Sequence, residues 1–256
     1  WGIVGGVPYY LDGVDLSRDL GPVLTEEVLS QRGYLHNEPE YVLRTELTDP
    51  NRYFAILTAI AAGKTTSNEI AQAIGIDGKQ ISTYTQKLER LRLIEREVPL
   101  TEQKAKSRRG RYRLLDPLFR FWFRFVYGNE DRYERLGEDA YEALIEPELA
   151  DFASPAFETL CRDALPDLYP DKLFLDIGRW WYKDHEIDIV GFTDEAMMVV
   201  GECKFTNAPI DYSALASLEE HAEAVRWTPR DGGDVDIEYA LFTRSGATQA
   251  VREAVA

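Results

Sequence analysis

The sequence has few residues of the kinds that build disulfide frameworks or zinc sites. It contains only two cysteines, Cys161 and Cys203, and three histidines. Two cysteines cannot form a disulfide scaffold, and this set of ligands argues against a four-ligand zinc site. We therefore expect a reducing, cytoplasmic setting.

Long apolar runs are also missing. No stretch approaches the roughly 20 residues that a membrane span requires, so the sequence predicts no membrane association. The chain begins at Trp1, without Met and without a basic segment followed by an apolar one. We therefore expect no signal peptide, and we expect the chain to be part of a longer protein.

Basic residues are scarce relative to acidic ones. The 256 residues include 29 Lys and Arg against 45 Asp and Glu, which gives a net charge of −16. Such acidity, with Lys rarer than Arg, is typical of proteins from salt-loving organisms, where screening weakens the repulsion between surface charges. The total charge therefore says less about partners than its distribution does.

The charge is distributed unevenly along the chain. Residues 1–50 carry a net charge of −6, residues 51–115 carry +7, and residues 116–256 carry −17. A single basic segment within an acidic protein indicates a surface that binds a partner, with nucleic acid as the first candidate.

The pattern of the basic segment predicts a winged helix-turn-helix. Apolar residues recur at helical spacing, and Thr66 and Gly75 supply start and stop signals for the second helix. The predicted helices cover residues 53–61, 66–75 and 80–93, and the predicted strands cover 94–98 and 110–114.

The third helix and the wing offer polar and basic side chains to a partner. The candidate DNA contacts are Lys79, Gln80, Thr83 and Lys87 from the helix, and Lys104, Lys106, Arg108, Arg109 and Arg111 from the wing. The alternative is a rigid spacer or protein contact with a solvated, charged wing.

The most informative charges lie in two apolar runs near the end of the chain. Residues 185–190 and 199–205 are rich in Val and Ile and predict buried strands, where charged side chains are costly. Asp188 lies in the first run, and Glu202 and Lys204 lie two apart in the second, so they project from one face. Two carboxylates and an ammonium group can hold a hard divalent cation and polarise a phosphate. The alternative is a buried ion pair that holds two strands in register.

The flanking segments extend this pattern. A helix is predicted over 152–165, a strand over 173–178, a helix over 210–227, a strand over 237–242 and a short helix from Thr248. This order resembles the PD-(D/E)XK restriction-endonuclease-like superfamily, although Ile187 stands where the motif often has Pro. The resemblance implies catalytic roles for Glu158, Asp188, Glu202 and Lys204. It also implies that Asp188, Glu202 and Glu158 ligate Mg²⁺ or Mn²⁺.

Two further motifs carry a second resemblance. A Gly-Gly-Val-Pro-Tyr-Tyr-Leu run occupies residues 5–11, and an Asp-Pro-Leu-Phe-Arg-Phe-Trp-Phe-Arg-Phe run occupies residues 116–125. With the winged helix between them, they resemble the part of archaeal AAA+/STAND-type ATPases that follows the nucleotide-binding core. The sequence also predicts acidic amphipathic helices over 20–32 and 38–46, and it predicts that Arg120 and Arg124 pair with acidic neighbours. The resemblance implies an ATPase core before Trp1 as a partner, ATP only in the full-length protein, and no ATPase activity from this chain.

Together these patterns predict an α+β multidomain chain with a mixed central sheet in its nuclease-like domain. The expected domains are a helical lid fragment (1–50), the winged helix (51–115), a helical connector (116–150) and the PD-(D/E)XK domain (151–256). The leading hypothesis is a DNA-binding, Mg²⁺-dependent endonuclease module, and oligomers are compatible with it. The alternative is an inactive regulatory or assembly module that contacts the ATPase core or other proteins.

Overall fold

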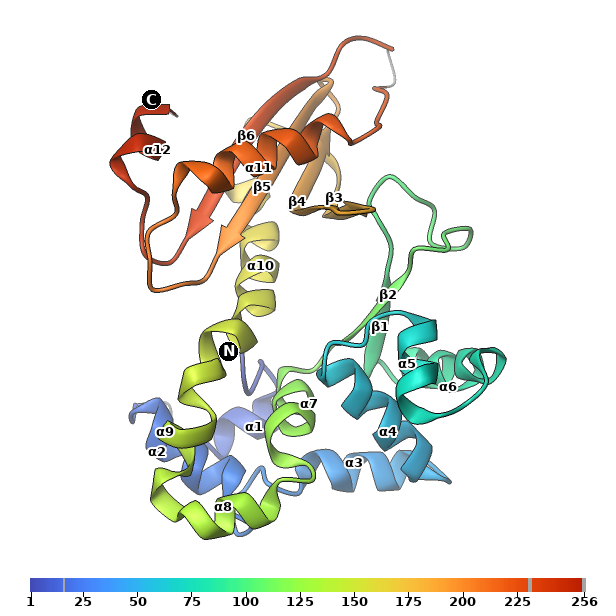
Figure 1. The fold of residues 1–256 in the computed structure, drawn as a ribbon, viewed down its shortest axis with the longest axis vertical. Coiled ribbons are helices and arrows are strands. Elements are labelled where there is room, and N and C mark those ends of the chain that lie inside the picture. Colours follow the sequence, from blue (N-terminus) through green and yellow to red (C-terminus); the bar gives the residue numbers. More distant parts are fainter. Residues whose placement is uncertain (16, 230–231, 255–256) are drawn as a thin grey trace. The chain divides into compact units, whose positions relative to one another are not determined.

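The structure is a computed structural model that describes residues 1–15, 17–229 and 232–254 (Figure 1). The chain divides into two compact units. One comprises Trp1–Glu97 with Gly110–Leu149, and the other comprises Val98–Arg109 with Ala150–Ala256. The predicted lid, most of the winged helix and the connector up to Leu149 thus lie in the first unit. The predicted winged-helix domain (51–115) is divided, because its loop over 98–109 belongs to the second unit.

The first unit is mainly helical. Its elements outside the winged-helix segment are α1 (Pro8–Asp12), α2 (Leu20–Leu24), η1 (Thr25–Leu29), α3 (Glu38–Glu46), α7 (Pro117–Phe121), η2 (Trp122–Val126), α8 (Glu130–Leu136), η3 (Gly137–Asp139), α9 (Ala140–Leu144) and η4 (Glu146–Glu148). The prediction of one helix over 20–32 was wrong, because α2 passes into the π-helical turn η1 and helical structure ends before Ser30. In this turn the Thr25 hydroxyl donates to the Gly21 carbonyl at 2.9 Å, which competes with regular helix geometry.

The winged-helix segment has the predicted order of elements. They are α4 (Pro50–Ala61), α5 (Ser67–Ile74), α6 (Gly78–Arg90), β1 (Ile94–Glu97) and β2 (Arg111–Leu114). The start of α5 is fixed by a capping box between Thr66 and Glu69, and the chain leaves it through Gly75 at a φ of 70°. The strands β1 and β2 pair antiparallel, with Ile94 opposite Leu114.

The aromatic run over 116–125 forms part of the core of the first unit. Trp122 donates its indole N–H to the His36 carbonyl at 2.6 Å, and its ring lies 6.2 Å from that of Phe54 on α4. Arg124 pairs with Glu148 at 2.8 Å, as predicted. Arg120 was also expected to face acidic groups, and the structure shows it donating to the Gly2 carbonyl at 3.4 Å.

The second unit has the predicted alternation of helices and strands. Its elements are α10 (Leu149–Leu168), β3 (Phe174–Tyr182), β4 (His185–Thr193), β5 (Met197–Lys204), α11 (Tyr212–Glu223), β6 (Asp236–Thr243) and α12 (Gln249–Ala254). The sheet order is β3-β4-β5-β6, with β5 and β6 parallel and the other neighbours antiparallel, so the sheet is mixed as expected.

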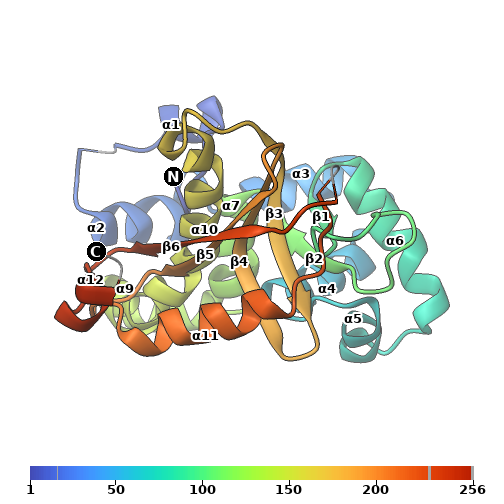
Figure 2. The same cartoon turned by 90° about the horizontal axis from the view of Figure 1, so that it is seen from above.

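Two helices cover the two faces of this sheet. Val190, Met198 and Val200 pack with residues of α11, whereas Ile189 and Val199 pack with residues of α10. Figure 2 shows α11 running alongside β5. Because side chains alternate along a strand, this assignment determines which face Glu202 and Lys204 of β5 occupy. Among the helices of the described residues, none is both long and apolar enough to cross a membrane.

Candidate phosphodiester-cleavage site and nucleic-acid surfaces

The predicted catalytic cluster lies where the ladder between β4 and β5 ends. The last paired residues are Ile189 and Gly201, so the same register places Asp188 opposite Glu202. One carboxylate oxygen of Asp188 accepts a hydrogen bond from the backbone N–H of Cys203 at 2.9 Å. The Asp188 side chain, rather than a backbone carbonyl of β4, thus accepts this hydrogen bond just beyond the ladder. The bond holds the Asp188 carboxylate next to β5.

Lys204 and Glu202 form the second half of the cluster. The Lys204 ammonium donates to a Glu202 carboxylate oxygen. Between them, Cys203 packs with the α10 cluster, so alternation directs both charged side chains toward the α11 face. Burial raises the pKa of Glu202, the charge of Asp188 raises it further, and Lys204 partly offsets both effects. Desolvation acts to lower the pKa of Lys204, but Glu202 outweighs it and the net shift is upward.

Glu158 has different partners from those expected. It lies on α10, its carboxylate is 3.7 Å from Arg179 and 3.9 Å from Arg162, and Arg179 also pairs with Glu186 at 2.6 Å. Burial raises the pKa of Glu158 to about 7, against the lowering effect of Arg179, and Asp188 adds to the rise. Asp188 is thus an electrostatic neighbour of both glutamates, but Glu158 belongs to an arginine cluster on the α10 side.

The donor set can be compared with what Mg²⁺ or Mn²⁺ requires. Among the described residues, no group of three or more His, Cys, Asp or Glu side chains is arranged to hold a metal ion. Mg²⁺ is usually bound through one or two carboxylates, with water and substrate phosphate completing the shell. Asp188 and Glu202, the residues next to the last paired position of the ladder, could supply those two carboxylates. Glu158 does not join them as a third ligand in this arrangement.

Three residues of this neighbourhood were not singled out from the sequence. Arg162 donates to the Asp188 carbonyl at 3.0 Å, and its position four residues after Glu158 on one helix was a usable signal. Arg179 lies on β3, and no local pattern connects it to Glu158. His221 on α11 contacts the Glu186 carbonyl at 2.8 Å through Nδ1, and its charge lowers the pKa of Glu202.

The predicted DNA contacts lie on two surfaces. On α6, Lys79, Gln80 and Thr83 are exposed and Lys87 is half-buried, while Ile81 and Leu88 form the buried side. This matches the predicted outward face of the third helix.

The wing cations divide between the two units. Lys104, Lys106, Arg108 and Arg109 are exposed and belong to the loop in the second unit, whereas Arg111 is half-buried on β2 in the first. Arg109 pairs with Glu102, and its guanidinium lies 4.7 Å from the centre of the Tyr182 ring. The wing loop is therefore attached to the sheet of the second unit rather than projecting freely.

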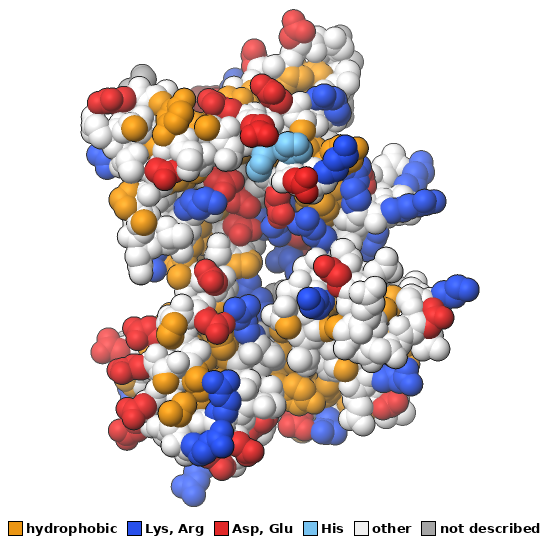
Figure 3. Space-filling model, in the orientation of Figure 1, with side chains coloured by type: hydrophobic (Ala, Val, Ile, Leu, Met, Phe, Trp, Pro, Cys, Tyr) orange, Lys and Arg blue, Asp and Glu red, His pale blue; other side chains and the backbone are white. Residues whose placement is uncertain are grey.

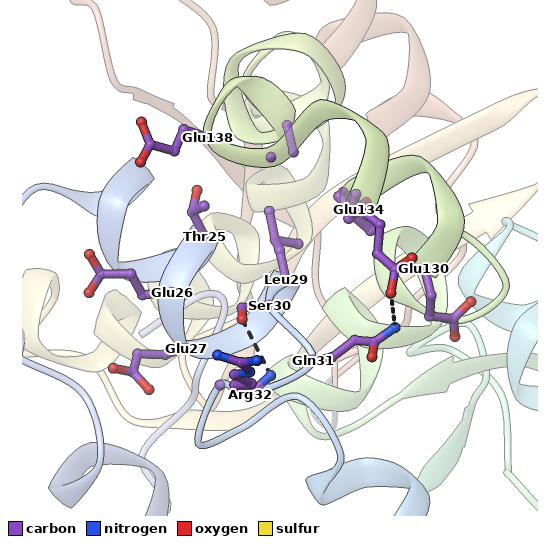
Figure 4. A pocket seen from close by; sticks show the side chains of 14 residues that line it. Thr25, Glu26, Glu27, Leu29, Ser30, Gln31, Arg32, Glu130, Glu134 and Glu138 are labelled. Carbon is purple, nitrogen blue, oxygen red and sulfur yellow. Dashed lines mark hydrogen bonds between the residues drawn. The ribbon is translucent and has the colours of Figure 1, made fainter.

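One pocket of the first unit has the wrong charge for nucleic acid. It encloses about 650 Å³ beside η1 and α8, and its lining contains five glutamates but only one basic residue, Arg32 (Figure 4). Figure 4 also shows Gln31 donating to Glu134, at 2.6 Å. Such a lining repels a phosphate backbone.

Comparisons with solved structures add little to this picture. The structure of NadR in complex with 4-hydroxyphenylacetate aligns with a TM-score of 0.24 and 19% identity, covering 53% of this chain and 84% of that one. The S. aureus MepR–DNA complex aligns with a TM-score of 0.26 and 20% identity, covering 49% and 89% respectively. Both TM-scores are too low to support a conclusion about fold or ligand.

Sequence comparison gives a clearer relationship. Uncharacterized protein MJECL04 of Methanocaldococcus jannaschii is 32% identical over 198 residues, which cover 76% of this chain and 44% of that protein. The chain therefore spans less than half of this curated relative. Residues 122–222, which include Glu158, Asp188, Glu202 and Lys204, match the family DUF234, described as "Archaea bacterial proteins of unknown function".

Proposed function

We propose that this chain is a DNA-binding module with a divalent-cation-dependent site for phosphodiester hydrolysis. The observation that supports the proposal is the end of the β4–β5 ladder. Ile189 pairs with Gly201 there, Asp188 and Glu202 are the next residues of the two strands, and Lys204 is hydrogen-bonded to Glu202. Partly buried charged groups with shifted pKa values are frequent at catalytic sites, and Glu202 and Lys204 have this property.

In this proposal each residue has one task. Asp188 and Glu202 hold Mg²⁺ or Mn²⁺, with the Cys203 amide fixing the orientation of the Asp188 carboxylate at 2.9 Å. A bound cation would supply a Lewis acid that offsets charge on the scissile phosphate. The Lys204 side chain is 42% exposed, so its ammonium group can donate a hydrogen bond to the attacking water or to a phosphate oxygen. Glu158 is assigned no ligand role, and it orders Arg162 and Arg179 behind Asp188.

The basic surfaces supply the DNA contacts in the same proposal. The exposed residues of α6 would contact one stretch of DNA, and the cations of the wing loop would contact phosphates. An ATPase core, with its ATP, remains part of the proposal for the full-length protein only. Its support is the motif resemblance over 5–11 and 116–125.

A cleavage assay tests this proposal. Plasmid, linear duplex, single-stranded and branched DNA are incubated with Mg²⁺ or Mn²⁺ over a range of salt concentrations. We expect cleavage by the wild type and a loss of at least about a hundredfold in Asp188→Asn, because the amide keeps the shape but removes the charge. Asp176→Asn is the matched control, since Asp176 is an exposed residue of β3 that bonds the adjacent Ile177 amide. A wild type that cleaves none of these substrates contradicts the proposal.

One observation favours the alternative of an assembly module. Glu158 lies 3.7 Å from Arg179 and 3.9 Å from Arg162, and Arg179 also pairs with Glu186, which is the pattern of a structural ion-pair network. If the wild type is inert in the assay above, this network becomes the better description of the cluster. The nuclease-like unit would then serve as a surface for protein contacts.

A further inference from the structure

We propose that a pocket in the second unit, between the wing loop and the β3–β4 turn, binds the phosphodiester backbone of a nucleic acid. The pocket encloses about 500 Å³. Three of its lining residues are cationic (Arg109, Lys183 and Arg226), and His185 lines it as well. Among the described residues that line it, none is acidic. This composition is unusual here, because residues 116–256 carry a net charge of −17.

The wing loop forms a fixed wall of the pocket. The Leu100 amide donates to the Arg179 carbonyl at 2.9 Å, the Trp180 indole N–H donates to the Thr101 hydroxyl at 3.1 Å, and the Trp181 indole N–H donates to the Arg109 carbonyl at 3.1 Å. Leu100 also packs against the core cluster of the α11 face. Both ends of the loop are thus attached to β3, and Arg109 is held at the pocket.

The cations of the pocket are positioned by an aromatic ring and by backbone carbonyls. The Arg109 guanidinium and the Lys183 ammonium lie 4.7 Å and 5.3 Å from the centre of the Tyr182 ring. Arg226 donates to the Glu223 carbonyl at 2.6 Å, near the end of α11. Arg109 also pairs with an acid, Glu102, and a guanidinium has five N–H donors, so capacity for a phosphate remains.

Lys183 lies in the two-residue turn that joins β3 to β4. Its φ is 53°, a conformation that tight hairpin turns use and that a Gly or Asn would adopt more easily. His185 follows two residues later, and its buried Nδ1 makes no hydrogen bond to the described residues.

The number of cations favours a polyanion over a small anion. The same loop carries Lys104, Lys106 and Arg108, all exposed, in addition to the three cations of the pocket. In the space-filling view, both blue Lys and Arg side chains and red Asp and Glu side chains lie next to the pale blue histidines (Figure 3). A chain of phosphates can use such a series of contacts, whereas one phosphate can use only two or three. The inference rests on the DNA-binding part of the proposed function and does not depend on cleavage.

The test is DNA binding by the 256-residue chain in EDTA, where no divalent cation permits cleavage. Binding of a short fluorescein-labelled duplex is followed by fluorescence anisotropy at increasing NaCl. The pocket variant is Lys183→Asn with Arg226→Gln, in which Asn tolerates the positive φ at residue 183. The charge-matched control is Lys172→Asn with Arg252→Gln. Lys172 pairs with Glu195, and Arg252 is an exposed residue of α12, so both lie outside the pocket.

We expect the pocket variant to lower the slope of log affinity against log salt by about 2, because each lost phosphate contact removes about one unit. At about 0.1 M salt this corresponds to an affinity loss of very roughly fiftyfold. The control should keep the wild-type slope. Equal slopes in the pocket variant and the wild type, or equal losses in the pocket variant and the control, would overturn the inference. Lys183→Asn alone, with about half the effect, provides a second variant should the double one fold poorly.

Competition identifies the ligand class. Inorganic phosphate and a mononucleotide are added at the phosphate concentration of an unlabelled duplex. Displacement by the duplex alone supports backbone binding, whereas equal displacement by a small anion overturns it. If the wild type binds DNA through the pocket but cleaves none of the substrates, only the catalytic proposal is contradicted. If the wild type cleaves DNA and the pocket variant binds DNA as tightly as the wild type, only the inference about the pocket is contradicted.

Discussion

Asp188 and Lys204 carry opposite charges in one cluster, and we expect their removal to have opposite effects on stability. In Asp188→Asn the amide oxygen can still accept the hydrogen bond from the Cys203 amide. The substitution also removes a charge that raises the pKa of both Glu158 and Glu202. The melting temperature without divalent cations should therefore stay level or rise.

Lys204→Ala should instead lower the melting temperature, because it leaves the half-buried Glu202 without its counter-charge. The partly exposed ammonium limits the loss to about 1 kcal/mol. Both variants should lose cleavage activity. Lys172→Ala, which removes an exposed pair with Glu195, is the control for loss of a lysine. Destabilisation by both Asp188→Asn and Lys204→Ala would indicate a structural ion pair.

At the scale of single residues, the sequence was informative where a charged residue occurred in an apolar strand. Asp188, Glu202 and Lys204 could be found because burial makes such charges costly, and two-residue periodicity placed the last two on one face. Arg179 could not be found in the same way. Its contact with Glu158 depends on β3 and α10 being packed together, and a pattern of neighbouring residues contains no information on that packing.

At the scale of elements, α5 offers a test of helix capping. The Thr66 hydroxyl accepts from the Glu69 amide at 3.3 Å, while the Glu69 carboxylate accepts from the Thr66 amide at 2.9 Å. Thr66→Ala should destabilise the first unit by about 1 kcal/mol, and Thr66→Ser should retain most of the stability. Urea denaturation followed by circular dichroism measures both. A loss of stability in Thr66→Ser equal to that in Thr66→Ala would contradict the capping role.

The same capping box predicts a pH dependence. Hydrogen bonds from the Thr66 amide and hydroxyl lower the pKa of Glu69 below 4.5. A carboxyl whose pKa is lowered by folding contributes stability above its unfolded value, and the contribution is lost as the pH falls through the folded value. The difference between wild type and Thr66→Ala should therefore shrink below pH 4.5.

Elements with strong end signals were predicted better than those without. The helix α3 covers Glu38–Glu46 as expected, and the capped helix α5 differs from its prediction by one residue at each end. The prediction of a helix over 20–32 was wrong because the apolar periodicity of the sequence continues past the π-helical turn. Tertiary contacts with the chain that follows the turn end the helix there. There the Leu35 amide donates to the Glu27 carbonyl at 2.9 Å.

At the scale of the whole molecule, the net charge of −16 predicts stabilisation by salt. The Debye length shortens from about 10 Å at 0.1 M to about 3 Å at 1 M, so repulsion between surface carboxylates weakens. The melting temperature should rise with NaCl or KCl. The double variant Glu219→Gln with Glu220→Gln removes two exposed charges of α11. Its melting temperature should therefore be higher than that of the wild type at low salt, and it should rise less as salt is added. A wild-type melting temperature that falls with salt would contradict this prediction.

The sequence by itself determined the order of the elements, the basic segment and the positions of Asp188, Glu202 and Lys204. These follow from periodicity, end signals and charge, which act over a few neighbouring residues. Only the tertiary structure decided that the wing loop is attached to β3, that Glu158 faces two arginines, and that Arg109, Lys183 and Arg226 line one pocket. Such contacts join residues tens of positions apart, and the packing of whole elements creates them.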